Sequence, residues 1–229
     1  MSKGGLKTNV FFPGKEITEM CVIVYKPAAS KMPSLDDLRK CFEANPDGAG
    51  LMWPGDDGYV HIRKGLMTWD AFERAVLSRD FAGKPVVFHF RISTQGGIQP
   101  GLTHPFPVCG SYEAMRSLCV KSRMGLAHNG IIGLTSDGSK DHNDTMRFVK
   151  DFAYPVYKAS GFHDQDGTLG SGLGDIAMGS RLAIMAGDGS VWLEGDWQER
   201  DGCYYSNLYA FHGRFQAWER GGWGYWKKQ

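Results

Sequence analysis

Residues 20–27 read Met-Cys-Val-Ile-Val-Tyr-Lys-Pro, and this stretch sets the start of the predicted fold. Three β-branched residues and a tyrosine follow Cys21 and predict a buried strand. Pro27 ends this strand, because proline lacks the N–H that a strand interior donates. We therefore expect the compact part of the protein to begin at Met20, with a cysteine opening an early strand.

The chain on either side of this compact part differs in composition. Residues 1–20 are polar and rich in Gly and Lys, and they predict an N-terminal arm or propeptide. Their apolar cluster, residues 10–12, is too short for the h-region of a secretory signal. Residues 21–229 are interpreted as a single domain without internal repeats, ending in an aromatic, Gly-rich tail from about residue 217.

Composition excludes several classes of protein. The 229 residues are 42% hydrophobic and 22% charged, which fits a globular protein with a sizeable core. The net charge of +1, without a basic stripe, gives no argument for nucleic-acid binding. Apolar runs are strand-sized, far below the roughly 18 residues of a membrane helix. The odd number of cysteines, five, predicts no disulfide framework, metal site or cofactor, and favours a reducing cytoplasm.

Hydrophobic periodicity predicts a mixture of strands and helices without a βαβ repeat, typical of the α+β class. The expected helices cover residues 35–44 after an N-cap at Ser34, 68–77, 112–119 and 145–153. The expected strands cover residues 21–25, 49–53, 59–63, 85–90, 124–127, 181–186, 191–194 and 204–209. Residues 159–179 contain six glycines and are interpreted as a mobile loop.

Four short clusters carry groups that one reaction would need: Cys21, His89-x-Arg91-x-x-Thr94, His128-Asn129-Gly130 and Asn143-Asp144-Thr145. Each cluster by itself has an ordinary structural interpretation. A strand cysteine is usually buried, an arginine usually forms a surface ion pair, and Asn-Gly usually forms a turn. An aspartate at a helix start stabilises the helix dipole. The order and spacing of the clusters together carry the argument.

In that order the clusters resemble the glutamine-hydrolysing domain of class II glutamine amidotransferases, in the N-terminal nucleophile (Ntn) hydrolase superfamily. The likeness covers residues 20 to about 150. Its motifs here are Met20-Cys21, Asp47-Gly48-Ala49-Gly50, His89-Phe90-Arg91-Ile92-Ser93-Thr94-Gln95-Gly96, His104-Pro105-Phe106, His128-Asn129-Gly130-Ile131-Ile132 and Asn143-Asp144-Thr145. Val22 and Gln95 depart from residues common in the family, and neither departure removes a catalytic atom.

The resemblance implies a four-layer αββα sandwich with two mostly antiparallel sheets, in which Cys21 opens a central strand. It implies a nucleophilic Cys21 whose own α-amine acts as the base. The side chain of Asn129 and the backbone N–H of Gly130 would form the oxyanion hole. Arg91 would bind the α-carboxylate of glutamine and Asp144 its α-ammonium. Thr94 and His104 complete the implied substrate-binding residues.

Cys21 is not the first residue, so its nitrogen is an amide while residues 1–20 are attached. Three explanations remain open at this point. Met20 is the true translation start, or residues 1–20 are a self-cleaved propeptide, or the fold is inactive and repurposed.

The resemblance implies release of ammonia from glutamine, either for hydrolysis or for transfer to an acceptor that the sequence does not identify. Because no synthase domain follows, a separate ammonia-accepting synthetase is a possible partner. A γ-glutamyl amide hydrolase is the alternative enzyme, and a catalytically silent binding or assembly protein is the alternative of another class. The pathway and the oligomeric state are not determined by these residues.

Overall fold

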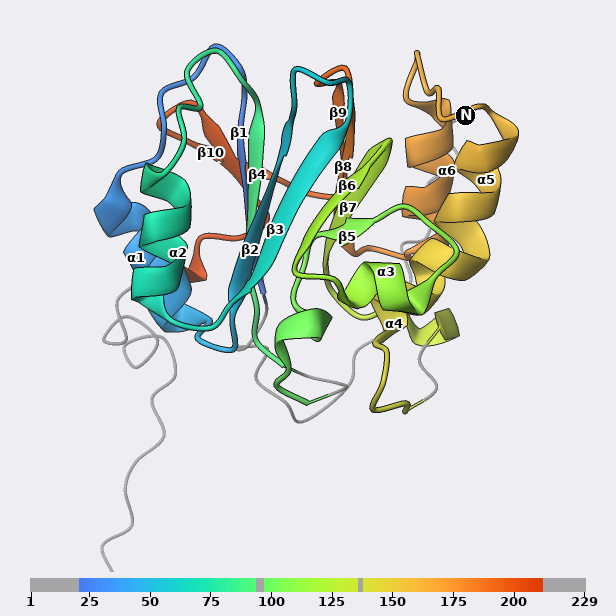
Figure 1. The fold of residues 1–229 in the computed structure, drawn as a ribbon, viewed down its shortest axis with the longest axis horizontal. Coiled ribbons are helices and arrows are strands. Elements are labelled where there is room, and N and C mark those ends of the chain that lie inside the picture. Colours follow the sequence, from blue (N-terminus) through green and yellow to red (C-terminus); the bar gives the residue numbers. More distant parts are fainter. Residues whose placement is uncertain (1–20, 94–96, 136–137, 212–229) are drawn as a thin grey trace, which may run out of the picture.

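The structure, a computed structural model, describes residues 21–93, 97–135 and 138–211. Two antiparallel β-sheets face each other, and helices cover the outer face of each sheet (Figure 1). The expected α+β class with two antiparallel sheets is confirmed. The predicted arm over residues 1–20 and the tail from about residue 217 lie outside the described residues.

The larger sheet has seven strands in the order β10-β11-β1-β4-β2-β3-β6, with every neighbouring pair antiparallel. Strand β1 lies inside the sheet between β11 and β4, so Cys21, which directly precedes it, opens an interior strand as expected. The strand bounds are β1 Val22–Lys26, β2 Ala49–Pro54, β3 Val60–Leu66, β4 Val86–Phe90, β6 Cys119–Ser122, β10 Gln198–Arg200 and β11 Cys203–Tyr205.

The smaller sheet has four strands in the order β5-β7-β8-β9, and its pairs are also antiparallel. Its strands are β5 Phe106–Pro107, β7 Met124–Asn129, β8 Arg181–Ala186 and β9 Val191–Glu194. Strand β7 pairs with β8 along its whole length, from Met124 opposite Ala186 to Asn129 opposite Arg181. This pairing holds the end of β7 in a fixed position, which matters for the site below.

Helices α1 (Leu35–Ala44) and α2 (Trp69–Leu77) pack against the larger sheet. Both begin where the sequence predicts, because Ser34 and Thr68 accept backbone N–H groups of the first turn. The smaller sheet is covered by α4 (Asp144–Phe148), which continues through a π-helical turn at Val149–Ala153 into α5 (Tyr154–Ala159), and by α6 (Thr168–Ile176). The other short helices of the described residues are α3 Tyr112–Arg116, η1 Pro100–Leu102, η2 Gly133–Thr135 and η4 Tyr209–Phe211.

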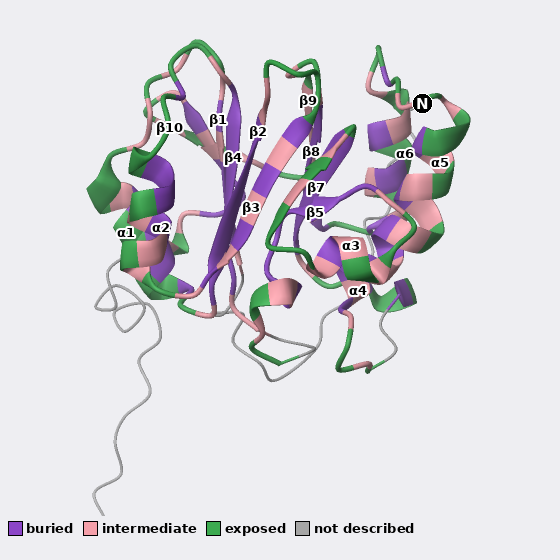
Figure 2. Ribbon diagram, in the orientation of Figure 1, coloured by how far each residue is buried: buried purple, intermediate pink, exposed green. Residues whose placement is uncertain are grey.

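The alternation of side chains along each strand divides the core into layers. Val22 and Val24 of β1 face α1 and α2, whereas Ile23 between them faces the smaller sheet. There it packs with residues of both sheets, including Ala127 of β7 and Met185 of β8. Figure 2 shows that the inner strands are buried and that exposed residues lie mainly on helices and turns.

The interpretation of residues 159–179 as a mobile loop is wrong, because α6 occupies their second half. The carboxylate of Asp164 is buried and accepts hydrogen bonds from the backbone N–H groups of Leu169 (3.1 Å) and Gly170 (2.9 Å). A carboxylate at this position satisfies the unpaired donors of the first helical turn. Asp164 lies five and six residues before the two groups that it caps, so the local sequence does not have the usual N-cap pattern.

Two glycines at α6 allow close packing against β9. A Cβ atom added at Gly174 would lie 3.0 Å from Cβ of Glu194, and one at Gly167, directly before the helix, would lie 2.7 Å from Cδ1 of Trp192. The glycines therefore let α6 approach β9 closely. High glycine content predicted a loop here because close helix–strand contact is a tertiary property.

Several element boundaries differ from the sequence prediction. The strands expected to end at residues 63 and 127 extend to Leu66 and Asn129. The helix expected over residues 112–119 ends at Arg116, and Cys119 pairs with Arg63 in the larger sheet. The strand expected over residues 204–209 ends at Tyr205, because the side chains that follow turn toward the ends of β1 and β7. Among the described residues, no helix is long and apolar enough to span a membrane.

Candidate active site

Residues far apart in the sequence meet at one end of the two sheets, the lower end in Figure 1. Cys21 precedes β1 and Arg91 follows β4, and the pairing of Val22 with Phe90 places these two residues side by side. Gly130 follows β7, and Asp144 opens α4. These residues line one cavity of about 30 Å³ together with Ile92, His104, His128, Asn143 and Thr145.

The cavity is about the size of one water molecule, so a ligand as large as an amino acid requires it to widen. The segment 94–96, which follows Arg91 and Ser93, lies outside the described residues, and with it the predicted substrate-binding residue Thr94. The other six predicted site residues lie at this end of the sheets. Five of them line the cavity, and Asn129 directly precedes Gly130.

Cys21 is half-buried, and its thiol contacts the backbone of Ile92. Sγ accepts the N–H of Ile92 at 3.4 Å and lies 3.5 Å from its carbonyl oxygen. Burial raises the pKa of the thiol to about 11, although the Ile92 N–H and the charge of Arg91 act in the opposite direction. In the chain with residues 1–20 attached, the sulfur is therefore a neutral thiol near pH 7.

Arg91 is 3% exposed and is held by groups on its own loop. Its guanidinium donates to the carbonyl oxygen of Gly97 (2.9 Å) and to Oγ of Ser93 (3.1 Å). Its backbone pairs with the Asp47-Gly48 turn, through the N–H of Asp47 and the carbonyl of Gly48. Burial lowers the pKa of Arg91 from its usual value, yet arginine remains charged in proteins. The site thus contains a fixed positive charge near Cys21.

Gly130 and Asn129 end β7 with a backbone that few residues tolerate. Gly130 has φ +145°, and a Cβ atom there would overlap Oγ of Ser180 and lie 2.9 Å from its Cβ. Asn129 is 1% exposed, and its Nδ2 donates to Oγ of Ser206 at 2.9 Å. One amide hydrogen is thereby used, which leaves the second for another acceptor.

Asp144 fixes the chain that follows Gly130. Its carboxylate accepts the backbone N–H of Ile132 (2.8 Å) and that of Thr145 (2.8 Å). The N-cap of α4 is Asn143, whose Oδ1 accepts the N–H of Met146 at 2.9 Å. The carboxylate retains acceptor capacity, because each of its oxygens has two lone pairs. Asp144 can therefore bind a cation while it orients the loop.

Three buried imidazoles lie at the cavity: His104 and His128 line it, and His89 lies behind them. His104 stacks on His89 with ring centroids 4.2 Å apart, and Nε2 of His89 donates to the carbonyl oxygen of His128 at 3.0 Å. Nδ1 of His128 lies 2.8 Å from Oγ1 of Thr145. Among the described residues neither ring nitrogen of His104 has a hydrogen-bond partner.

Burial keeps these rings neutral. It lowers the pKa of His89 to about 3 and that of His128 to about 4, and it places the pKa of His104 well below its usual value. No set of three His, Cys, Asp or Glu side chains within the described ranges is arranged to hold a metal ion. The imidazoles therefore form a polar, uncharged wall next to the cation of Arg91.

Two residues of the site, Ser206 and Asn207, were not assigned a role from the sequence. Ser206 contacts Asn129 as described above, and Nδ2 of Asn207 donates to the carbonyl oxygen of Cys21 at 2.8 Å. A polar Ser-Asn pair directly after an aromatic strand was the available signal, but its partners lie more than 70 residues away.

A larger cavity of about 540 Å³ lies between residues 26–35 and 76–83. It contains none of the predicted site residues, and the buried Lys26 beside it already donates to three backbone carbonyl oxygens. The predicted chemical groups therefore meet at the small cavity beside Cys21 and not at this larger one.

No protein-family model matches the chain, and no curated protein shows significant sequence similarity to it.

Proposed function

We propose that this protein is a glutamine-hydrolysing enzyme of the class II amidotransferase type, with an αββα Ntn-hydrolase fold and Cys21 as its N-terminal nucleophile. The observation that carries the proposal is the shared cavity: a thiol, a fixed guanidinium, a carboxylate and a glycine N–H, contributed by four separate segments, lie around one small space. These groups are the ones that the hydrolysis of an amino-acid amide needs.

The nucleophile requires a base. In the proposed reaction the peptide bond before Cys21 is absent, either because residues 1–20 have been removed or because translation starts at Met20. The free α-amine accepts the thiol proton while Sγ attacks the amide carbon of glutamine. The C–N bond breaks with transfer of the proton to the leaving ammonia, and a γ-glutamyl thioester remains. Water then releases glutamate and regenerates the thiol.

The α-ammonium that forms when the α-amine takes the thiol proton also stabilises the thiolate beside it. In the attached chain, burial raises the pKa of Cys21 to about 11. A cation formed on the same residue favours the thiolate, so processing should lower this pKa. Removal of residues 1–20 therefore supplies the base and makes the sulfur more reactive at neutral pH.

The oxyanion of the tetrahedral intermediate needs preorganised donors. The second hydrogen of Asn129 Nδ2 and the N–H of Gly130 are assigned this task. Asn129 is buried and already fixed by Ser206, so the donor loses little freedom when the intermediate forms.

Substrate selection is assigned to the two charges of the cavity. Arg91 binds the α-carboxylate, Asp144 binds the α-ammonium, and His104 contributes a neutral wall beside them. Asparagine is one methylene shorter than glutamine, so its amide carbon does not reach Sγ once both α-groups are held. Thr94 keeps its predicted binding role as part of the proposal.

The test uses protein beginning at Cys21 and protein that retains Met1, each mixed with glutamine, asparagine or a γ-glutamyl anilide. We expect the processed protein to release ammonia from glutamine and the unprocessed protein to be inactive. Asparagine hydrolysed as fast as glutamine would contradict the binding of both α-groups. Full activity in protein shown by intact mass to retain residues 1–20 would contradict the mechanism.

The same experiment separates the alternatives. A strong preference for the anilide over glutamine identifies a γ-glutamyl amide hydrolase. Inactivity of the processed form with every substrate favours a binding or assembly protein. Ammonia that is released only when a second protein is added points to a separate ammonia-accepting synthetase.

A further inference from the structure

Ser206 links the two sheets at the point where the site is built. It directly follows β11, is 1% exposed, and its backbone N–H donates to the carbonyl oxygen of Ile23 at 2.9 Å. Its Oγ accepts the N–H of Ile23 at 2.9 Å and Nδ2 of Asn129, from the smaller sheet, also at 2.9 Å. One hydroxyl oxygen thus contacts the strand of the nucleophile and the proposed oxyanion donor.

The two lone pairs of a serine hydroxyl are its full acceptor capacity, and both are used here. Asn129 therefore points one N–H at Ser206 and cannot rotate without losing a buried hydrogen bond. The adjacent residue acts on the nucleophile, because Asn207 donates to the carbonyl oxygen of Cys21. Consecutive residues after β11 thus hold the residue of the nucleophile and the proposed oxyanion donor.

We propose that Ser206 is a positioning residue for the hydrolysis: it fixes the Asn129 amide relative to the strand that carries Cys21. Ser206 lies one hydrogen bond behind the donor, and it is not among the residues that line the cavity. The expected effect of Ser206 on kcat rests on the proposed function. The hydrogen bond between Asn129 and Ser206 can be observed even in a protein without activity.

The kinetic test compares Ser206→Ala, Asn129→Ala and the double variant, all beginning at Cys21. Loss of an oxyanion donor lowers kcat by about 100-fold. We expect Ser206→Ala to lower kcat about tenfold with KM nearly unchanged, because the donor is displaced and substrate binding is not. In the Asn129→Ala background the same change should lower kcat less than about twofold, because its target is gone.

Two further variants control for a general loss of structure. Ser206→Thr retains the hydroxyl and should recover most of the activity. Ser30→Ala removes another serine hydrogen bond near β11, which Ser30 Oγ donates to the carbonyl oxygen of Gly202 (2.6 Å). Neither Ser30 nor Gly202 lines the cavity at Cys21. We expect Ser30→Ala to keep wild-type kcat. Equal losses in Ser30→Ala and Ser206→Ala would contradict a positioning role.

Should Ser206→Ala fail to fold, Asn207→Leu provides the second test. This change removes the donor to the Cys21 carbonyl without altering the contact of Asn129. We expect the double variant Asn207→Leu/Asn129→Ala to lower kcat by the product of the two single effects, because Asn207 acts on the nucleophile and not on Asn129. If the effect of Asn207→Leu instead disappears in the Asn129→Ala background, the assignment of separate roles to the two neighbouring residues is wrong.

A nuclear magnetic resonance measurement separates failure of this inference from failure of the proposed function. The side-chain amide signals of Asn129, identified by their disappearance in Asn129→Asp, should shift and exchange faster with solvent in Ser206→Ala and stay unchanged in Ser30→Ala. A silent enzyme with that shift contradicts the proposed function alone. An active enzyme whose Ser206→Ala variant has wild-type kcat and an unshifted Asn129 contradicts the positioning role.

Discussion

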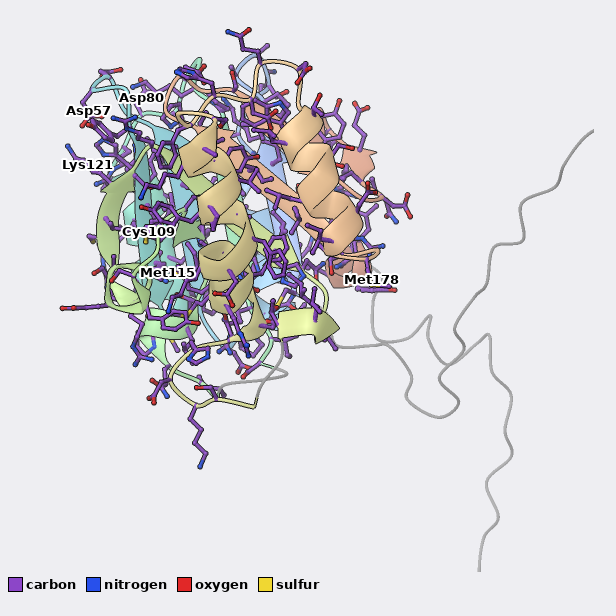
Figure 3. The ribbon with its side chains drawn as sticks, turned by 90° about the vertical axis from the view of Figure 1, so that its right-hand side faces the viewer. Asp57, Asp80, Cys109, Met115, Lys121 and Met178 are labelled. Carbon is purple, nitrogen blue, oxygen red and sulfur yellow. The ribbon has the colours of Figure 1, made fainter. Side chains whose placement is uncertain are left out.

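The two ends of the β-sandwich handle polar groups in opposite ways. At one end, Asp57 of the β2–β3 turn forms an ion pair with Lys121 (2.6 Å; Figure 3) and a hydrogen bond with His61 (2.9 Å). All three side chains are partly exposed to water. At the other end, Arg91 and Asn129 are buried beside Cys21. Charges in water interact weakly, whereas burial shifts the pKa of a group and fixes its geometry.

The two ends therefore differ in how much solvation their polar groups lose on folding. An uncharged imidazole or a fixed guanidinium inside a protein is useful for binding and catalysis, and the folded state loses solvation to keep it there. The charged groups at the exposed end keep their contact with water and do not have this cost. Changing residues at each end of the sandwich tests this contrast.

The largest effect is expected at the nucleophile. Cys21→Ala should abolish release of ammonia from glutamine, because no other group forms the thioester. The urea midpoint should change little, since the sulfur contacts only the backbone of Ile92 among the described hydrogen bonds. Ammonia release and urea unfolding of the same preparation check both statements, and wild-type turnover would remove Cys21 from the mechanism.

Asn129 and Arg91 should separate catalysis from binding. Asn129→Ala should lower kcat by roughly 100-fold, because an oxyanion donor acts in the transition state. Arg91→Lys should instead raise KM about tenfold, because an ammonium group cannot reproduce the planar guanidinium. Steady-state kinetics on processed protein measure both, and a pure KM effect of Asn129→Ala would contradict its assigned role.

Acid should destabilise the folded protein through the buried histidines. Below pH 6.5 the unfolded chain protonates these rings, whereas the folded state keeps His128 neutral to about pH 4 and His89 to about pH 3. The unfolded state then binds more protons. The free energy of unfolding therefore decreases as the pH is lowered, by up to about 1.4 kcal/mol per pH unit for each ring.

His89→Gln tests this origin, because glutamine still has a donor for the carbonyl oxygen of His128 but does not titrate in this range. Urea unfolding of both proteins between pH 4.5 and 6.5 should give a shallower slope for the variant, by up to about 1.4 kcal/mol per pH unit. Equal slopes would show that other groups cause the acid sensitivity.

The smallest effect is expected at the exposed end. Asp57→Asn removes the ion pair with Lys121, which water and salt already screen, and keeps a side-chain oxygen beside His61. We expect the urea midpoint and the hydrolysis of glutamine to stay close to wild type. A large loss of stability would mean that the two ends do not differ as described.

Sequence patterns predicted most of the local structure. Capping by Ser34, the β-branched strand after Cys21, and the turns between β2 and β3 and between β8 and β9 depend on neighbours within a few residues. The pattern failed over residues 159–179, where the cap of α6 and the glycines against β9 act through tertiary contacts.

The sequence by itself determined which chemical groups are present and in what order: a cysteine at the start of a strand, an arginine after another, Asn-Gly and an aspartate at a helix start. Antiparallel pairing of β1 with β4 and of β7 with β8 brings these groups to one end of the sheets. Only the tertiary structure decided that Ser206 holds Asn129 and that three imidazoles stay neutral. Hydrogen-bond partners and burial depend on residues that are distant in the chain, so no local pattern encodes them.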